Sequence, residues 1–365
     1  MRIKSLLSGL YSFVPILYSS TGSASRPASA RYCYSVWLRH LVTLFGHGIK
    51  QIPETITEIG PGNSLGTGLC GLLSGVQKYY SCDIKQFYSI EADLKIFDEL
   101  VELFRHREPI PDDQEFPNVR PILNSYEFPY HIFPELHLQS CLSEERLCIV
   151  RQSLRESVTD TSTDRAIQIK FFIPSEQWDV LRPGTVDLVY SQAVMEYLDN
   201  PHEAYHDYYQ MLRPGGVMSH QIDFRSHGLA NEWDGHWVYS NFTWKIICGR
   251  RPAIISRLPH SYHIEAQIKA GFTIIADIKN QCKATVERGK LSKRFSALSD
   301  EDRSTGTSHI ISARRPTTHS EKDKSRSEWI TSDRHASMKL STQAIIITSF
   351  SFGTHYLHLF HYRSF

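Results

Sequence analysis

Short runs of apolar residues alternate along this chain with longer segments in which apolar residues recur every three or four positions. The short runs predict buried β-strands, and the longer segments predict amphipathic helices. Strands are expected at residues 54–59, 78–82, 167–172, 272–277 and 309–313, the last two as an antiparallel pair. Strands that alternate with helices are typical of α/β proteins with a largely parallel sheet.

Two helices should frame the first strand. In the segment 34–45, one face collects Tyr34, Trp37, Leu38, Leu41 and Phe45. A second stripe runs over residues 65–76, where Ser64 is the expected N-cap and Gly75 the expected C-terminal stop. The connection from 84 to 165 is long and carries two more amphipathic stripes around a Pro/aromatic segment, so we expect a helical insertion that caps the site cleft.

The turn after the first strand is the most informative part of the chain. Residues 57–66 read TEIGPGNSLG, with an acidic residue, Glu58, before glycines at 60, 62 and 66. Glycines let backbone pass close to a ligand at φ values that other residues avoid. In the dinucleotide fingerprint GxGxxG a third glycine would stand where this chain has Leu65, which disfavours an NAD-dependent oxidoreductase. A glycine turn without any ligand is the other alternative.

Further motifs carry a family resemblance. Asp83 lies at the end of the second strand, 21 residues after Gly62. Residues 186–197 read VDLVYSQAVMEY, and residues 211–218 read MLRPGGVM, a helix end, tight turn and new strand. Together with the ExGxGxxxG spacing, these motifs resemble class I S-adenosylmethionine-dependent methyltransferases over residues 30–315, and within them bacterial enzymes associated with glycan biosynthesis.

The resemblance implies a Rossmann-like seven-stranded sheet of order 3-2-1-4-5-7-6 with flanking helices. It also implies S-adenosyl-L-methionine as cofactor. Glu58 would accept from the cofactor's ammonium, the turn would approach its amino-acid part, and Asp83 would accept from the ribose. The residues expected to bind the cofactor are Glu58, Gly60, Pro61, Gly62, Asp83, Ser191 and Gln192.

The chemistry should lie after the fifth strand, because the carboxyl ends of parallel strands carry the site in such sheets. Asp223, His227 and His236 are the candidate catalytic groups, as base or as substrate-orienting residues. Each histidine could equally make a structural hydrogen bond. No metal site is expected, since His220 and Asp223 should point to opposite faces of a strand. The aromatic cluster of Trp233, Trp237, Tyr239 and Trp244 is read as core, with sugar stacking as the alternative.

Composition narrows the class of protein. The 365 residues are 41% hydrophobic with a net charge of +1, which gives no reason to expect nucleic acid or an anionic membrane as partner. Seven cysteines without a CxxC pair indicate reduced thiols and a cytoplasmic protein. Arg2 and Lys4 before an apolar run imitate a signal peptide. Because polar residues interrupt that run, we favour a structured extension, and we expect no membrane span.

We therefore divide the chain into an N-terminal helical extension (1–50), a methyltransferase domain (51–315) with the insertion at about 84–165, and a disordered tail (316–365). The predicted function is methyl transfer to a hydroxyl or amine of a small molecule or glycan. The alternative is a catalytically inactive, methyltransferase-like binding or scaffold protein.

Overall fold

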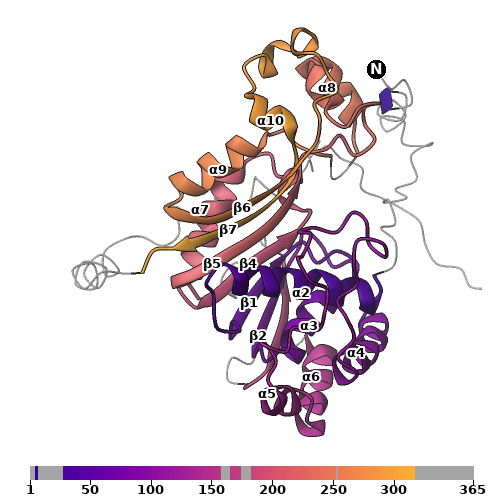
Figure 1. Ribbon diagram of the computed structural model, residues 1–365, viewed down its shortest axis with the longest axis vertical. Helices are drawn as coiled ribbons and strands as arrows, with labels where there is room; N and C mark the ends of the chain where they lie inside the picture. Colours follow the sequence, from indigo (N-terminus) through magenta and orange to yellow (C-terminus); the bar gives the residue numbers. More distant parts are fainter. Residues whose placement is uncertain (1–4, 7–27, 158–164, 174–181, 252–253, 317–365) are drawn as a thin grey trace, which may run out of the picture.

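A single seven-stranded sheet organises the molecule (Figure 1). The computed structural model describes residues 5–6, 28–157, 165–173, 182–251 and 254–316. The strands are β1 (Thr55–Ile59), β2 (Lys78–Cys82), β3 (Gln168–Phe172), β4 (Val186–Gln192), β5 (Leu212–Asp223), β6 (Phe272–Gln281) and β7 (Thr305–Arg314). Their order is β3-β2-β1-β4-β5-β7-β6, which confirms the predicted fold class.

The direction of the strands sets the position of the site. β3, β2, β1, β4 and β5 pair in parallel, whereas β7 lies antiparallel between β5 and β6. The expected antiparallel pair is thus confirmed, although β6 and β7 are longer than the sequence indicated. The carboxyl ends of β1, β2, β4 and β5 therefore meet along one edge of the sheet.

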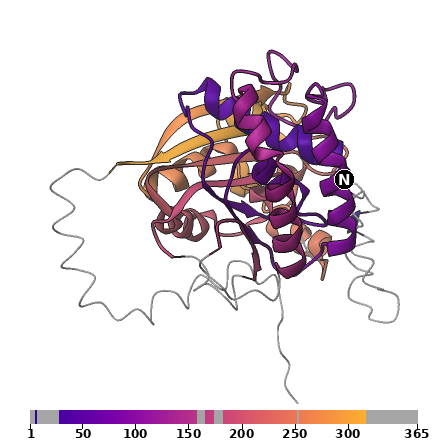
Figure 2. The same cartoon turned by 90° about the horizontal axis from the view of Figure 1, so that it is seen from below.

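Helices cover both faces of the sheet. They are α2 (Ala30–Gly46), α3 (Gly66–Leu73), α4 (Ile90–Arg105), α5 (Glu135–Cys141), α6 (Glu144–Glu156), α7 (Pro201–Met211), α8 (Asn241–Cys248), α9 (His260–Lys269) and α10 (Asp300–Ser304). α2, α3, α4 and α6 share one hydrophobic core with the sheet, and α7 and α9 share a second core on the other face. Seen from below, the purple helices of the first half and the orange strands of the second half lie at different sides (Figure 2).

The apolar stripe of α2 explains its place on the sheet. Trp37 is fully buried, its ring packs against Tyr190 of β4, and its indole N–H donates to the hydroxyl of Ser74 at 2.8 Å. α2 also contacts α3 and α4, so it belongs to the helix layer on this face of the sheet. The predicted packing of this helix on the sheet is confirmed.

Only part of the insertion lies beside the candidate site. Helix α6 packs on β3, and α5 lies with it at the end of the molecule far from α8 and α10 (Figure 1). The segment 111–126 has no regular structure and turns back toward α2 and the end of β4. The expected cap is therefore a loop, while the helices of the insertion extend the layer on the sheet.

A small lobe stands at the carboxyl end of β5. Its described residues, 224–251, 254–258 and 282–304, surround two satellite cores, one centred on Trp244 and Ile247, the other on Trp237 and Phe295. Leu6, from the few described residues near the N-terminus, packs against the first of these cores. The lobe forms the top of Figure 1 and overhangs the strand ends.

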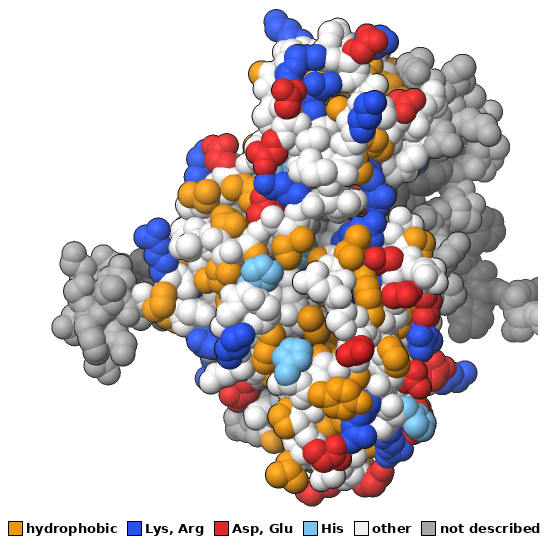
Figure 3. Space-filling model, viewed as in Figure 1, with side chains coloured by type: hydrophobic (Ala, Val, Ile, Leu, Met, Phe, Trp, Pro, Cys, Tyr) orange, Lys and Arg blue, Asp and Glu red, His pale blue; other side chains and the backbone are white. Residues whose placement is uncertain are grey.

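The surface carries both signs of charge. On the face shown in Figure 3, acidic and basic side chains are interspersed, in keeping with the net charge of +1. None of the helices in the described ranges has the length and apolar character needed to cross a membrane. Most of the predicted N-terminal extension before residue 28, and the predicted tail after residue 316, lie outside the described residues.

Candidate functional site

The glycine turn lies between the ends of β1 and β4. Gly60 and Gly62 have φ angles of 69° and 68°, in the left-handed region that favours glycine. A β-carbon on Gly60 would lie 2.6 Å from Val194, which follows β4, whereas a β-carbon on Gly62 would meet nothing within 4 Å. Gly60 is therefore needed for packing of the turn, and Gly62 is the position at which the turn opens to a ligand.

A carboxylate from α4 already occupies the N-terminus of α3. The predicted N-cap, Ser64, is wrong by one position, because α3 begins at Gly66 with Leu65 at the N-cap. The hydroxyl of Ser64 instead donates to Asp93 at 2.5 Å, and the N–H of Leu65 donates to the other oxygen of Asp93 at 3.1 Å. Burial raises the pKa of Asp93 to about 6, and these two hydrogen bonds only partly offset that effect.

This arrangement discriminates between ligands. A pyrophosphate binds at a helix N-terminus through free backbone N–H groups. Here Asp93, which is fully buried, holds one of those groups and would repel a phosphate. The site therefore favours a nucleoside ligand without a pyrophosphate, in agreement with the glycine spacing.

Glu58 lies directly under the turn, facing the helix layer. Only 5% of its surface is exposed, and the phenol of Tyr79 donates to its carboxylate at 2.5 Å. Burial raises the pKa of Glu58 to about 7, although the hydrogen bond from Tyr79 and the nearby phenol of Tyr190 lower it in part. A cation brought to this buried carboxylate would stabilise its ionised form.

Asp83 lies across the turn from Glu58. It is half-buried, and its two oxygens accept from the N–H of Gly62 at 3.2 Å and from the N–H of Ile84 at 2.7 Å. Burial raises its pKa, against the effect of these two amides. Asp83 is thus held at the end of β2, at the same edge as the open side of Gly62.

Ser191 and Gln192 point to opposite faces of the sheet, as neighbours on a strand do. The side chain of Ser191 is fully buried and hydrogen-bonded to Nδ1 of His220 at 2.8 Å, toward α7. Any contact of Ser191 with a cofactor would therefore have to come from its backbone. Gln192 faces α2, where Nε2 of His40 lies 3.1 Å from its amide oxygen.

His40 belongs to a buried polar chain that fixes Gln192. Its Nδ1 lies 2.7 Å from the hydroxyl of Ser219, which lies 2.9 Å from Nε2 of His309. Burial lowers the pKa of His40 to about 4, so the ring is neutral at pH 7. Because the amide oxygen of Gln192 only accepts, His40 carries its proton on Nε2 and accepts at Nδ1.

The end of β5 gathers a second set of polar groups. Arg225 donates to both oxygens of Asp223, at 2.9 Å through Nε and 2.7 Å through Nη2. Nε2 of His227 lies 3.3 Å from Asp223, and its Nδ1 lies 3.1 Å from the phenol of Tyr197. Burial alone would raise the pKa of Asp223, but the hydrogen bonds from His227 and Arg225 outweigh it and hold that pKa well below its usual range.

A cavity of about 540 Å³ opens over this array. Its walls are formed by Asn118, Asp223, Arg225, Ser226, His227, Gly228, Ala230, Asn231 and Trp233. All but Asn118 come from the end of β5 and the loop after it, and Asn118 comes from the insertion loop. His227 has a left-handed φ of 47°, a conformation that costs a non-glycine residue energy and is found preferentially at functional sites.

Comparisons with known proteins agree with this geometry. Residues 154–219, which include β3, β4, α7 and the first part of β5, match the model of a methyltransferase domain family. This part of the chain therefore resembles a methyltransferase domain, and the sheet order is the one that the resemblance to class I S-adenosylmethionine-dependent methyltransferases predicts. A comparison with curated protein sequences finds no match.

Three of the solved structures that are similar to this chain are methyltransferases or putative methyltransferases by name. An S-adenosylmethionine-dependent methyltransferase from Mesorhizobium loti is 12% identical, covering 77% of this chain and 98% of its own, with a TM-score of 0.36. A putative sarcosine dimethylglycine methyltransferase from Galdieria sulphuraria is 10% identical. The match covers 76% of this chain and 85% of that protein, with a TM-score of 0.40. Phosphoethanolamine N-methyltransferase 2 from Haemonchus contortus, in complex with S-adenosyl-L-methionine, is 12% identical. The match covers 79% of this chain and 58% of that protein, with a TM-score of 0.38.

S-adenosylmethionine is the cofactor that the resemblance to methyltransferases implies for this domain. The residues at the strand ends fit it, because the turn opens at Gly62, Asp83 is held beside that opening, and the carboxyl of Glu58 is buried beneath the turn. Asp93, which would repel a pyrophosphate, is compatible with a cofactor that has none.

The remaining candidate residues lie either in the buried core of the small lobe or in the wall of the cavity. His236 is 1% exposed, and burial lowers its pKa to about 3, with the charges of Arg257 and His227 adding to the shift. It is absent from the cavity walls in the part of the chain that the structure describes. The core interpretation is confirmed for Trp237, Tyr239 and Trp244, which are buried, while Trp233 lines the cavity.

The metal alternative receives no geometric support. Across the described ranges, no group of three or more His, Cys, Asp or Glu residues has a metal-binding arrangement. His220 packs against Tyr205 and Tyr208 of α7, whereas its neighbours Ser219 and Gln221 bond to groups on the α2 face. Alternate residues of a strand share one face, so Asp223 belongs to the face of Ser219 and Gln221. His220 and Asp223 therefore lie on opposite faces, as predicted.

Sequence reasoning gave no role to three residues of this site, and it offered a fourth, Glu196, only as a reserve candidate. Asp93, Tyr197 and Arg225 act through contacts that only the fold creates. Glu196 is 4% exposed, and within the described structure neither of its oxygens has a partner of hydrogen-bonding geometry. Burial and the charge of Asp223 raise the pKa of Glu196 well above its usual range, with nearby amides and Arg225 opposing. The Asp-x-Arg-x-His spacing after β5 was the only signal available for Arg225.

Proposed function

We propose that this methyltransferase modifies a hydroxyl, or an amine, of a small molecule or glycan that binds in the cavity at the end of β5. The observation that carries the proposal is the hydrogen-bonded array of Asp223, His227 and Tyr197 at that cavity. This array supports a base at the carboxyl ends of the strands, along the same edge as the glycine turn.

The cofactor end of the site is assigned to residues around the turn. Gly60, Pro61 and Gly62 pass close to the amino-acid part of the cofactor, and Glu58 accepts from its ammonium. Asp83 accepts from the ribose, and Gln192, held by His40, borders the cleft. When bound, S-adenosylmethionine supplies a methyl group on a sulfonium, which the acceptor takes as it gives up a proton.

His227 is the proposed base. Asp223 is ionised, so it accepts from Nε2–H of His227 and leaves the lone pair at Nδ1. That lone pair accepts from the phenol of Tyr197, so the acceptor's hydroxyl or amine must replace the phenol before His227 can take its proton. Asp223 itself is a poor proton acceptor, because Arg225 and His227 stabilise its charge. It orients the imidazole and stabilises the charge that His227 acquires with the acceptor's proton.

The cavity walls suit a polyhydroxylated or otherwise polar acceptor. Asn118, Ser226 and Asn231 offer donors and acceptors, and Trp233 offers an aromatic surface. With the net charge of +1, this supports a small molecule or glycan rather than nucleic acid. All seven cysteines are free thiols, which supports a cytoplasmic location.

The alternative is a methyltransferase-like protein that binds the cofactor without turnover. The decisive experiment is calorimetry with S-adenosylmethionine, for which we expect micromolar affinity, about −7 to −8 kcal/mol. A transfer assay with methyl-labelled cofactor on small metabolites and cell-envelope glycan extracts then separates the two. Labelled product that His227→Ala abolishes supports the enzyme, whereas tight binding without label on any fraction favours the scaffold.

A further inference from the structure

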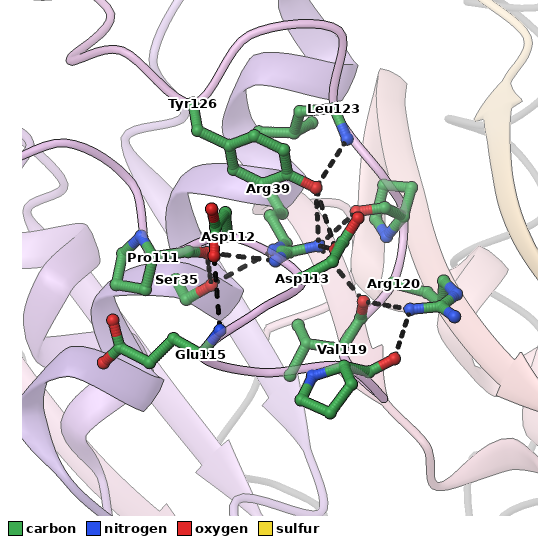
Figure 4. A network of polar contacts seen from close by, with 12 residues as sticks. Ser35, Arg39, Pro111, Asp112, Asp113, Glu115, Val119, Arg120, Leu123 and Tyr126 are labelled. Carbon is green, nitrogen blue, oxygen red and sulfur yellow. Dashed lines mark hydrogen bonds and ion pairs between the residues drawn. The ribbon is translucent and has the colours of Figure 1, made fainter.

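A buried arginine on α2 holds the insertion loop in place (Figure 4). Arg39 is fully buried, and its guanidinium donates to the carbonyls of Pro111 at 3.0 Å, Val119 at 3.1 Å and Pro121 at 2.9 Å. It also pairs with Asp113 at 3.0 Å. Because carbonyls on both sides of residue 120 are bound to one rigid guanidinium, that residue has a fixed position.

The residue so held is a second arginine. Arg120 is half-buried, and its carbonyl accepts from the side-chain amide of Gln192 at 3.5 Å. Its Nη1 donates to the carbonyls of Pro117 and Val119, both at 2.9 Å. Its Nε is buried and has no hydrogen-bond partner among the residues that the structure describes.

Arg120 is also without a counter-ion there. Within the described ranges no carboxylate oxygen lies within 4.0 Å of its guanidinium, whereas Arg225, the other arginine near the cleft, is paired with Asp223. A partly desolvated guanidinium gains from an anion, and its planar donors match a carboxylate.

The position of Arg120 relates it to the glycine turn. Its carbonyl contacts Gln192, the last residue of β4, and Val194 two residues later packs against Gly60. The glycine turn is the part of the site assigned above to the amino-acid portion of the cofactor. That portion carries an ammonium, assigned to Glu58, and a carboxylate, for which the turn offers no cation.

We propose that Arg120 binds the carboxylate of the cofactor's amino-acid portion, so that the insertion loop completes the cofactor site. The inference rests on the proposed function for the assignment of the turn. Glu58 and Arg120 then match the two opposite charges of the ligand, one from the sheet and one from the loop. Arg39 is the positioning residue that holds Arg120 toward Gln192.

Two ligands that differ only in this carboxylate test the proposal. Calorimetry would compare S-adenosylmethionine with decarboxylated S-adenosylmethionine, using the wild-type protein, Arg120→Gln and Arg120→Lys. We expect Arg120→Gln to weaken binding of the intact cofactor about ten- to hundredfold, the usual range for a lost charged hydrogen bond, and to change binding of the decarboxylated ligand less than about twofold. Arg120→Lys should restore part of the preference.

The matched control is Arg107→Gln, which removes an arginine paired with Glu135 away from the cleft and should leave both affinities unchanged. Equal losses for the two ligands in Arg120→Gln, or no loss for either, would overturn the inference while leaving the proposed function intact. Failure of the wild-type protein to bind either ligand would overturn both. Melting temperatures of all variants identify any loss that comes from unfolding.

Discussion

Cofactor affinity should depend on pH through the carboxyl of Glu58. This side chain is 5% exposed, and its pKa of about 7 means that half of the free protein carries a neutral carboxyl at that pH. If the ammonium of the ligand pairs with the ionised form, binding must expel the proton. Lower pH therefore weakens binding, and the effect saturates above the pKa.

The size of the effect follows from linkage. With a free pKa of about 7 and an ionised carboxylate in the complex, affinity should fall about 25-fold between pH 7.5 and 5.5, equal to about 2 kcal/mol. The proton released on binding should rise from about one quarter per site at pH 7.5 to about 0.9 at pH 6. Over this range the ligand's amine remains an ammonium.

Calorimetry in two buffers of different ionisation enthalpy measures affinity and proton release together. The demethylated product, S-adenosylhomocysteine, is the suitable ligand because it cannot turn over. Asp83 and Asp93 also lie at the turn with raised pKa values, so the control is Glu58→Gln, which keeps the shape and removes this titration. A pH-independent affinity in the wild type, or an unchanged slope in Glu58→Gln, would refute the assignment of Glu58.

Four further outcomes are expected. Asp83→Ala should cost about 1.5–3 kcal/mol of cofactor affinity with little change in melting temperature, as calorimetry and thermal unfolding would report; the reverse result would make Asp83 structural. Gly62→Asn, which tolerates a left-handed φ, should weaken cofactor binding with little loss of melting temperature, whereas Gly60→Val should lower the melting temperature because its side chain would clash with Val194 after β4, and thermal unfolding followed by circular dichroism separates the two. His227→Ala should lower turnover 10²–10⁴-fold at unchanged cofactor affinity in the labelled-methyl assay; unchanged turnover would exclude it as base. Truncation after Arg315, which follows the end of β7, should leave stability and binding intact, and loss of folding would mean that the tail completes the core.

Local patterns were sufficient to predict the framework. The strands and helices repeat apolar residues with periods that the backbone itself imposes, so the expected strands appear with their ends shifted by few residues. β1 begins at Thr55 rather than at residue 54, and β3 at Gln168 rather than at 167. The order of the sheet came from the motifs at the strand ends, because pairing across the sheet has no local signature.

The site was predictable only where one segment makes it. The glycine turn is such a segment, but the sequence did not indicate which of its glycines faces open space. Ser64 was misjudged because the better partner for the end of α3, Asp93, arrives from α4, 29 residues later. His236 was expected in the cleft because it lies in the loop after the fifth strand, but its ring packs on Trp237 with centroids 4.5 Å apart and is buried with it.

The carboxylate of Asp93 has a consequence for attempts to exchange the cofactor of this fold. A redesign of the site for a dinucleotide would first restore the GxGxxG fingerprint, which here means replacing Leu65 with glycine. The obstacle lies elsewhere, since Asp93 would still hold the N–H of residue 65 and face the incoming phosphates with its own charge. Conversion would require a change in α4 as well, and removing Asp93 alone would leave the hydroxyl of Ser64 to satisfy the start of α3. The class of ligand that this protein accepts therefore depends on two segments, the glycine turn and Asp93 of α4. Only the glycine turn is recognisable as a sequence motif.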